Sequence, residues 1–130
     1  MMYPTDVRYT KTHEWARLED GMVTIGITSY ASEELSDIVY VELPDVGDKT
    51  EEGGAFATLE SVKAVSEVYS AVKGTIGAAN LKLQDEPGLI NEEPYGEGWI
   101  VKVQPDRSVS LEGLMDAEAY DKYVEAERGA

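Results

Sequence analysis

The stretch Ala55–Tyr69, AFATLESVKAVSEVY, places a single lysine, Lys63, between two short apolar segments. Ala55–Leu59 precedes the lysine and Ala64–Tyr69 follows it. Apolar runs of this length, bounded by turn residues, are typical of half-buried β-strands. The sequence therefore predicts a β-hairpin that presents Lys63 at its tip.

Segments of the same kind occur on both sides of this hairpin, separated by turns rich in Gly, Pro and Asp. Several short strands with frequent turns predict a mostly β sandwich or barrel. Because no low-complexity linker divides the 130 residues, we expect one domain over residues 1–130. The other predicted strands are Met22–Ile27, Val39–Leu43, Lys73–Ala78 and Trp99–Val103.

Two helices are expected beside the strands. A short helix over residues 29–35 has Ser29 as its candidate N-cap and ends at Ser36. A longer helix over residues 117–127 has Asp116 as its cap, with Tyr120 and Val124 on one face.

Few side chains in this sequence are suited to catalysis. The chain has no Cys and one His, His13. The lack of Cys excludes disulfides, thiolate nucleophiles and soft metal sites, and one His removes most metal and triad arrangements. We therefore predict no metal site, and any redox or group-transfer chemistry must come from an attached group.

The chain is strongly acidic, with 26 Asp and Glu against 11 Lys and Arg and a net charge of −15. Nucleic acids and anionic membranes are therefore not expected partners, because both are bound through Lys and Arg. The charge fits either simple solubility or an acidic face for basic partners. No apolar run could cross a bilayer, and the start Met1–Asp6 resembles no signal or transit sequence. We expect a cytoplasmic protein, or a mitochondrial matrix protein if the chain is a processed organellar form.

A lysine that carries a cofactor must be exposed, held on a rigid turn and flanked by small residues. Val62 and Ala64 meet the size requirement, and the flanking strands supply rigidity. An isolated lysine with these features is still more often an ordinary surface residue, so the wider sequence has to decide.

The chain resembles the glycine cleavage system H proteins along nearly its whole length. Any one of the matching segments is weak evidence, but their order and spacing together are specific. They are Tyr9–Trp15, Thr24–Thr28, Asp37–Pro44, Glu60–Ala64, Gly74, Asn80, Leu89–Asn91, Pro94–Trp99 and Asp116–Tyr120.

This resemblance implies a hybrid barrel-sandwich fold of the biotinyl/lipoyl class and a non-catalytic carrier with lipoate in amide linkage to Lys63. Glu60, Ser61, Val62 and Ala64 would form the segment recognised by a lipoate ligase or a lipoyl/octanoyl transferase. The arm would take the aminomethyl group of glycine from a pyridoxal-phosphate glycine decarboxylase to a tetrahydrofolate-dependent aminomethyltransferase. Dihydrolipoyl dehydrogenase would then reoxidise it.

A loaded arm would end in an amine, which is cationic at neutral pH and needs protection from water. Glu14 and Glu67 are the candidates to hold it, together with Thr12 and His13, because the resemblance places these segments near the arm. The alternative is that both glutamates are ordinary solvated carboxylates of strands. A catalytic pair of His13 and Glu14 is not favoured, because no Ser, Cys or metal partner accompanies it.

Some residues depart from the family pattern. Ser36 stands where the family often has Gly, so it must tolerate a left-handed cap or end the helix differently. Ser29 stands where Asp is common. We expect Trp15 and Trp99 in the core, and Asn80 and Asn91 as hydrogen-bonding or turn residues.

Other functions remain to be weighed against the aminomethyl carrier. A biotin carrier is disfavoured, because Val62 and Ala64 occupy the positions where biotin proteins have methionine. A lipoyl domain of a 2-oxoacid dehydrogenase would normally sit in a longer chain with a linker. An H-like protein that relays lipoyl groups and an unmodified acidic interaction module both remain open. We expect a monomer, because a shuttle must keep its arm accessible.

Overall fold

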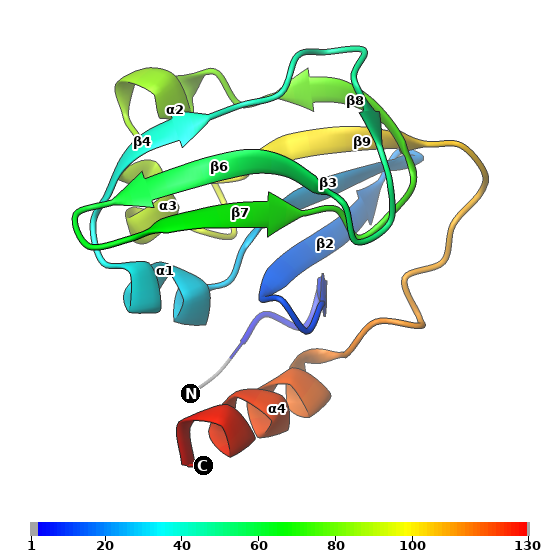
Figure 1. The fold of residues 1–130 in the computed structure, drawn as a ribbon. Helices are drawn as coiled ribbons and strands as arrows, with labels where there is room; N and C mark the ends of the chain where they lie inside the picture. The colour runs from blue at the N-terminus through cyan, green and yellow to red at the C-terminus, as the bar shows by residue number, and fades with distance from the viewer. Residues whose placement is uncertain (1–2, 130) are drawn as a thin grey trace.

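The computed structural model describes residues 3–129, so residues 1, 2 and 130 of the expected domain, including Met1 and Met2 of the N-terminal prediction, lie outside it. The fold is mostly β, as predicted, with one six-stranded and one three-stranded sheet, both antiparallel. Figure 1 shows the three-stranded sheet in front of the larger one, with the C-terminal helix below both.

The six-stranded sheet has the order β1-β2-β3-β9-β8-β5 and the smaller sheet the order β4-β6-β7. All six strands predicted from the sequence are present, whereas β1, β2 and β5 were not predicted. The bounds are β1 Arg8–Tyr9, β2 Glu14–Glu19, β3 Met22–Ile27, β4 Ile38–Glu42, β5 Lys49–Thr50, β6 Ala55–Ser61, β7 Val65–Tyr69, β8 Gly74–Ala79 and β9 Val101–Pro105.

The helices are α1 Ser29–Leu35, α2 Lys82–Asp85, α3 Leu89–Glu92 and α4 Ala117–Gly129. The two expected helices are confirmed, although α4 continues two residues beyond the predicted end at residue 127. The helices α2 and α3 were not predicted, because four residues are too few to show a helical period. Each has one buried apolar side chain, Leu83 in α2 and Ile90 in α3.

The ends of the expected helices differ in how well the sequence predicted them. The N-cap of α1 is Thr28 rather than Ser29, because Thr28 is extended and its Oγ1 accepts a hydrogen bond from the Ala31 N–H at 3.2 Å. Asp116 caps α4 as expected, since its carboxylate accepts from the Ala119 N–H at 2.9 Å. Ser36 has a positive φ of 66° at the end of α1, but its ψ of −157° lies outside the left-handed helical region, so the helix ends differently from a left-handed cap.

The main core fills the space between the two sheets. Its centre contains side chains from both sheets with no exposed surface, such as Ile25 of β3, Leu59 of β6 and Val103 of β9. This arrangement follows from strand alternation, since every second residue faces the opposite sheet.

A second cluster packs between the N-terminal strands and α4. It contains Tyr3, Val7, Tyr9, Trp15, Tyr120 and Val124. The Trp15 ring is fully buried and its Nε1–H donates to the Pro94 carbonyl at 2.8 Å, as expected of a core indole. Trp99 is only half-buried, with the Lys102 ammonium 5.2 Å above its ring.

The two asparagines join segments that are distant in the sequence. Asn91 accepts from the Ile38 N–H at 2.9 Å and donates to the Ser36 carbonyl at 2.8 Å, which fixes the passage from α1 into β4. Asn80 donates to the carbonyls of Glu97 and Trp99, both at 2.7 Å. Both asparagines therefore act as the predicted hydrogen-bonding residues.

Within residues 3–129 no helix is both long and apolar enough to cross a membrane. The same residues contain no cluster of three or more His, Asp or Glu side chains placed to hold a metal ion.

Candidate functional site

Lys63 lies in the three-residue turn that joins β6 to β7, and its side chain is exposed. Ser61 organises this turn. Its Oγ accepts from the N–H groups of Lys63 at 3.2 Å and Ala64 at 3.0 Å, and the Ser61 N–H donates to the Ala64 carbonyl at 2.8 Å. A hydroxyl that accepts hydrogen bonds from the backbone N–H groups of a turn fixes the conformation of that turn.

The tip of this hairpin is also tied to the rest of the protein. The Val62 N–H donates to the Asp37 carbonyl at 3.0 Å, just before β4 begins. Val62 and Ala64, which flank the lysine, are both exposed. The lysine therefore projects from a turn whose backbone is held on both sides, as the sequence predicted for a presented amine.

Exposed apolar side chains surround the lysine turn. Val39, Tyr40, Val62 and Val65 keep between 52% and 67% of their surface. Tyr40 pairs with Glu60, and Glu60 pairs with Val65, so these three side chains form one row across the small sheet. Such a row beside the lysine is suited to contact with a protein partner.

A second row on the same face brings further carboxylates. Glu42 pairs with Thr58, and Thr58 pairs with Glu67. We call the residues Tyr40, Glu42, Glu60, Val65 and Glu67 the outer sheet face, because all five are exposed. Glu67 is thus a solvent-facing strand residue, four positions along the chain from Lys63.

Glu14 has a different environment, because only 2% of its surface is exposed. Its carboxylate accepts hydrogen bonds from the hydroxyls of Thr10 at 2.6 Å and of Thr12, and from the Tyr69 N–H at 3.2 Å. Burial raises the pKa of the Glu14 carboxyl, and these hydrogen bonds lower it in part. The alternative that Glu14 is a solvated carboxylate is therefore wrong.

Glu14 is positioned by the turn over residues 10–14, which we call the Glu14 turn. The Thr10 N–H donates to the Glu14 carbonyl at 2.9 Å, and the Glu14 N–H donates to the Thr10 hydroxyl at 3.1 Å. His13 closes this turn just before β2, with a φ of 69°, a left-handed conformation that non-glycine residues rarely adopt.

The His13 ring does not pair with Glu14. Its Nδ1 lies 2.8 Å from the hydroxyl of Tyr120, and its Nε2 lies 3.0 Å from a carboxylate oxygen of Glu127, both on α4. Both ring nitrogens are therefore engaged by the C-terminal helix, and no His13–Glu14 catalytic pair exists in this structure.

The candidate residues lie along one strand. Lys63 precedes β7, Glu67 lies in its middle, and Glu14 contacts its last residue, Tyr69. From Ala64 to Tyr69, the last residue of β7, an extended chain spans about 17 Å at the usual rise per residue. Thr10, the Tyr69 N–H and Tyr120 were not predicted as parts of this site, and only the spacing of Thr10, Thr12 and Glu14 hinted at shared hydrogen bonds.

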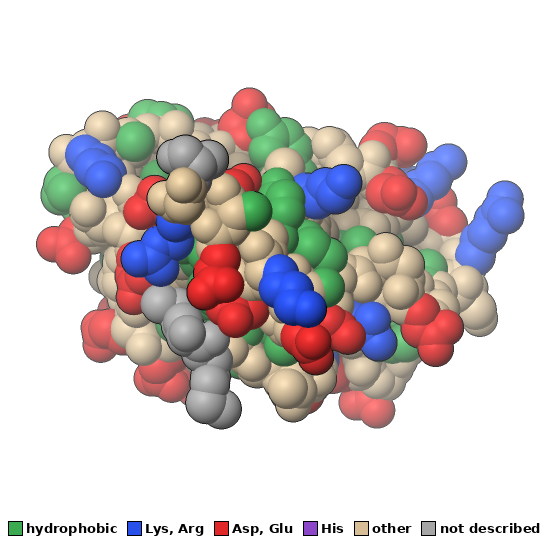
Figure 2. All heavy atoms as spheres, turned by 90° about the horizontal axis from the view of Figure 1, so that it is seen from below, with side chains coloured by type: hydrophobic (Ala, Val, Ile, Leu, Met, Phe, Trp, Pro, Cys, Tyr) green, Lys and Arg blue, Asp and Glu red, His purple; other side chains and the backbone are tan. Residues whose placement is uncertain are grey.

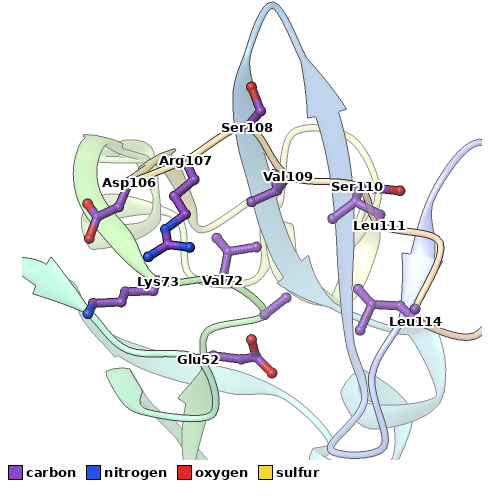
Figure 3. A pocket seen from close by; sticks show the side chains of 12 residues that line it. Glu52, Val72, Lys73, Asp106, Arg107, Ser108, Val109, Ser110, Leu111 and Leu114 are labelled. Carbon is purple, nitrogen blue, oxygen red and sulfur yellow. The ribbon is translucent and has the colours of Figure 1, made fainter.

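A hollow of about 590 Å³ lies elsewhere on the described surface. It is formed by the β7–β8 turn and the segment between β9 and α4. Figure 3 shows Val109, Leu111 and Leu114 along the second of these segments and Val72 on the first, with Ser108 turned outward. None of the residues predicted from the sequence to bind or hold the arm lines this hollow.

The acidic side chains do not gather on the face that carries α4. Figure 2 shows Asp and Glu side chains scattered over that face with Lys and Arg between them. This view gives no support to an acidic docking patch there.

Two facing antiparallel sheets with an exposed lysine in a tight hairpin define the class of biotinyl and lipoyl carriers with a barrel-sandwich fold. A family model described as glycine cleavage H-protein matches residues 7–127, so this chain belongs to the glycine cleavage H-protein family. The fold class predicted from the sequence is confirmed.

Relatives and a solved structure agree with this assignment. The glycine cleavage system H protein of Thermus thermophilus is 50% identical over 127 residues, covering 98% of this chain and 99% of that protein. The one from Anaeromyxobacter sp. strain K is 48% identical over 125 residues, covering 96% and 98%. The crystal structure of the H protein from Mycobacterium marinum superposes with a TM-score of 0.82 at 36% identity, covering 98% of this chain and 100% of that one.

Members of this family are the lipoyl carriers of the glycine cleavage system and are not catalytic by themselves. The chain is accordingly a carrier subunit that works with the other components of that system. This confirms the function inferred from the ordered sequence match.

Proposed function

We propose that Lys63 is the lipoyl attachment site and that Glu60, Ser61, Val62 and Ala64 form the segment that a lipoate ligase or lipoyl/octanoyl transferase recognises. The observation that carries this proposal is the geometry of residues 61–64, which we call the Lys63 turn. There the Ser61 hydroxyl accepts hydrogen bonds from two backbone N–H groups, and the Lys63 side chain is exposed. In the modification, the Nζ amine displaces the activating group from the lipoyl carboxyl and forms an amide, which removes the lysine charge.

When attached, the lipoyl disulfide supplies the redox couple and the sulfur atoms that this cysteine-free chain lacks. The partners we propose are glycine decarboxylase with pyridoxal phosphate, an aminomethyltransferase that uses tetrahydrofolate, and dihydrolipoyl dehydrogenase. The exposed apolar and acidic outer sheet face lies beside Lys63, where each partner enzyme has to approach.

We further propose that Glu14 holds the amine end of the loaded arm, with Thr12 and Glu67 beside it and His13 keeping the turn in place. The support is electrostatic: a desolvated carboxylate attracts an ammonium group more strongly than a solvated one. Glu14 is buried at the end of β7, Thr12 bonds to its carboxylate from the exposed side, and Glu67 lies two residues before Tyr69. An arm that runs from Lys63 along β7 would meet these groups.

Intact mass spectrometry tests the attachment site. We expect one lipoyl adduct on the protein after co-expression with a lipoate ligase, and no adduct on Lys63→Arg. Lys73→Arg, at another exposed lysine, is the matched control and should keep the adduct. An adduct that survives Lys63→Arg would refute the assignment.

The holding role is tested by the rate at which the loaded, isolated protein loses its aminomethyl group. Glu14→Gln keeps the side-chain volume but removes the charge, and it should speed the loss at least about threefold. Glu67→Gln should have a smaller effect in the same direction, because this carboxylate is exposed. Glu42→Gln, on the same outer sheet face, is the control, and equal rates in all three variants would contradict the proposal.

A further inference from the structure

The hydroxyl of Tyr120 is a meeting point of three elements. Tyr120 is fully buried on α4, and its oxygen lies 2.8 Å from Nδ1 of His13 and 2.7 Å from Oγ1 of Thr28. His13 belongs to the Glu14 turn, and Thr28 is the N-cap of α1. One hydroxyl therefore links the C-terminal helix, the Glu14 turn and the start of α1.

The protons in this network can be placed from chemistry. The Glu127 carboxylate accepts only, so with a neutral imidazole Nε2 of His13 carries the proton and Nδ1 is an acceptor. Tyr120 then donates to His13 and accepts from the Thr28 hydroxyl, whose oxygen receives the Ala31 N–H at 3.2 Å. Each proton is used once, so removal of the Tyr120 oxygen leaves both His13 and Thr28 without that partner.

The same network fixes the backbone of the Glu14 turn. The His13 N–H donates to the Thr10 carbonyl at 3.2 Å, and the His13 carbonyl accepts from the Thr28 N–H at 3.0 Å. A second residue of α4, Tyr123, donates its hydroxyl to the Lys11 carbonyl at 2.9 Å. A non-glycine residue adopts a positive φ only where contacts with its surroundings stabilise that conformation. For His13, several of these contacts come from α4.

We propose that Tyr120 is a positioning residue for Glu14: through its bonds to His13 and Thr28 it keeps the Glu14 turn closed and the carboxylate shielded from water. The consequence for the loaded arm rests on the proposed role of Glu14. Docking of α4 and the environment of the carboxylate are thereby coupled, although no side chain of α4 is bonded to Glu14 among the hydrogen bonds of residues 3–129.

Tyr120→Phe tests this proposal, since it removes one oxygen and keeps the ring stack with Tyr9, whose centroid is 4.5 Å away. Tyr3→Phe is the matched control. The Tyr3 ring packs against Tyr120 at 4.9 Å, but its buried hydroxyl has no hydrogen-bond partner among the described residues. Both variants lose a tyrosine oxygen from the same cluster, and only one of them loses hydrogen bonds.

The first measurement is the titration of the Glu14 carboxyl, followed by carbon NMR in the unmodified protein. In Tyr120→Phe the midpoint should move down toward the ordinary glutamate value, because burial is the main cause of the raised pKa and an open turn admits water. Tyr3→Phe should leave it unchanged. An unchanged Glu14 midpoint in folded Tyr120→Phe would overturn the positioning role.

The second measurement is the loss of the aminomethyl group from the loaded protein, which should be about threefold faster in Tyr120→Phe and unchanged in Tyr3→Phe. If Glu14→Gln has no effect on this rate, the holding role of Glu14 fails while the NMR titration still decides the positioning role. A normal loss rate in Tyr120→Phe, with an accelerated rate in Glu14→Gln, would refute the positioning role.

A second variant keeps the test valid if Tyr120→Phe unfolds. His13→Asn removes the ring but retains a residue that tolerates positive φ, so the backbone of the turn is not strained. It should lower the Glu14 midpoint as Tyr120→Phe does, and the double variant should shift it by less than the sum of the two, because both remove the contact between His13 and Tyr120. Additive shifts, or no shift in His13→Asn, would contradict the proposed route.

Discussion

The Lys63 turn and the Glu14 turn are two short loops that are both stabilised by hydrogen bonds of hydroxyl side chains. They differ in whether the functional side chain is exposed or buried. In the Lys63 turn the Ser61 hydroxyl bonds to backbone groups within three residues and leaves the amine in water. In the Glu14 turn the hydroxyls of Thr10 and Thr12 bond to a buried carboxylate. One loop presents a functional group, and the other encloses one.

The two loops also differ in what holds them. The Lys63 turn has local bonds and one tie to Asp37. The Glu14 turn depends on distant groups, since Glu14 meets Tyr69, 55 residues away, and His13 meets Tyr120, 107 residues away. In the roles proposed above, the Lys63 turn has to be accessible to several enzymes, and the Glu14 turn has to exclude water.

The largest expected difference between the loops is in stability. Glu14→Ala should lower the free energy of unfolding by about 2–3 kcal/mol, because it leaves the Tyr69 N–H without its acceptor and opens a cavity. Lys63→Ala should change it by less than about 0.5 kcal/mol, since the side chain is exposed. Urea denaturation measures both. Similar costs at the two positions would remove the contrast between a loop that encloses its functional side chain and a loop that exposes it.

The second largest effect is a dependence of stability on pH that belongs to Glu14. Burial raises the pKa of Glu14 in the folded protein above its ordinary value of 4.5, so folding favours the protonated carboxyl. This contribution is complete below pH 4.5 and is lost as pH rises through the folded pKa. Relative to Glu14→Gln, the wild-type protein should therefore lose stability over that range and then level off.

Urea denaturation of both proteins at steps of pH gives this difference directly, because the other charged groups are common to the two chains. A constant difference at all pH values would show that the Glu14 carboxyl has the same affinity for protons in the folded and unfolded states.

The Lys63 turn was predictable from the sequence because its determinants are its own neighbours. Strand alternation places β6 and β7, and Ser61 at the end of β6 fixes the turn between them. The same holds for α4, where Asp116 and the spacing of Tyr120 and Val124 indicated the helix.

The Glu14 turn was only partly predictable, because its partners are far apart in the chain. The ordered resemblance led us to expect Glu14 near the arm, but nothing local predicted the contact with Tyr69 or the contacts of His13 with α4. Thr28 was missed as an N-cap for a similar reason. Two hydroxyl residues, Thr28 and Ser29, are adjacent, and the tertiary bond to Tyr120 favours the first.

The third prediction uses this pair of hydroxyl residues. Thr28→Ala should cost about 1–2 kcal/mol, because it removes the cap of α1 and the buried contact with Tyr120. Ser29→Ala should cost less than about 0.5 kcal/mol, since the Ser29 N–H keeps its bond to the Tyr95 hydroxyl. Thermal and urea unfolding of the two variants compare them. Equal losses would mean that the cap is shared.

The smallest effect is expected in the Lys63 turn itself. Ser61→Ala removes the acceptor for two backbone N–H groups, but both groups are exposed and water replaces it, so stability should fall by only about 0.5–1 kcal/mol. The effect on the rate of modification should be larger than the effect on stability. A turn with several conformations spends less time in the one that the ligase can bind. We expect lipoylation at limiting protein concentration to slow about two- to fivefold.

Ser66→Ala is the matched control for this last effect, because the Ser66 hydroxyl makes only a contact of 3.5 Å with the Glu67 carbonyl. The rate of adduct formation, followed by intact mass, distinguishes two roles of Ser61. If Ser61 acts by fixing the turn, Ser61→Thr should restore the rate, because it keeps the hydroxyl. If the ligase instead contacts the serine side chain directly, the added methyl group would keep the rate low. A fast Ser61→Ala variant would contradict both roles and leave the flanking strands as the source of rigidity.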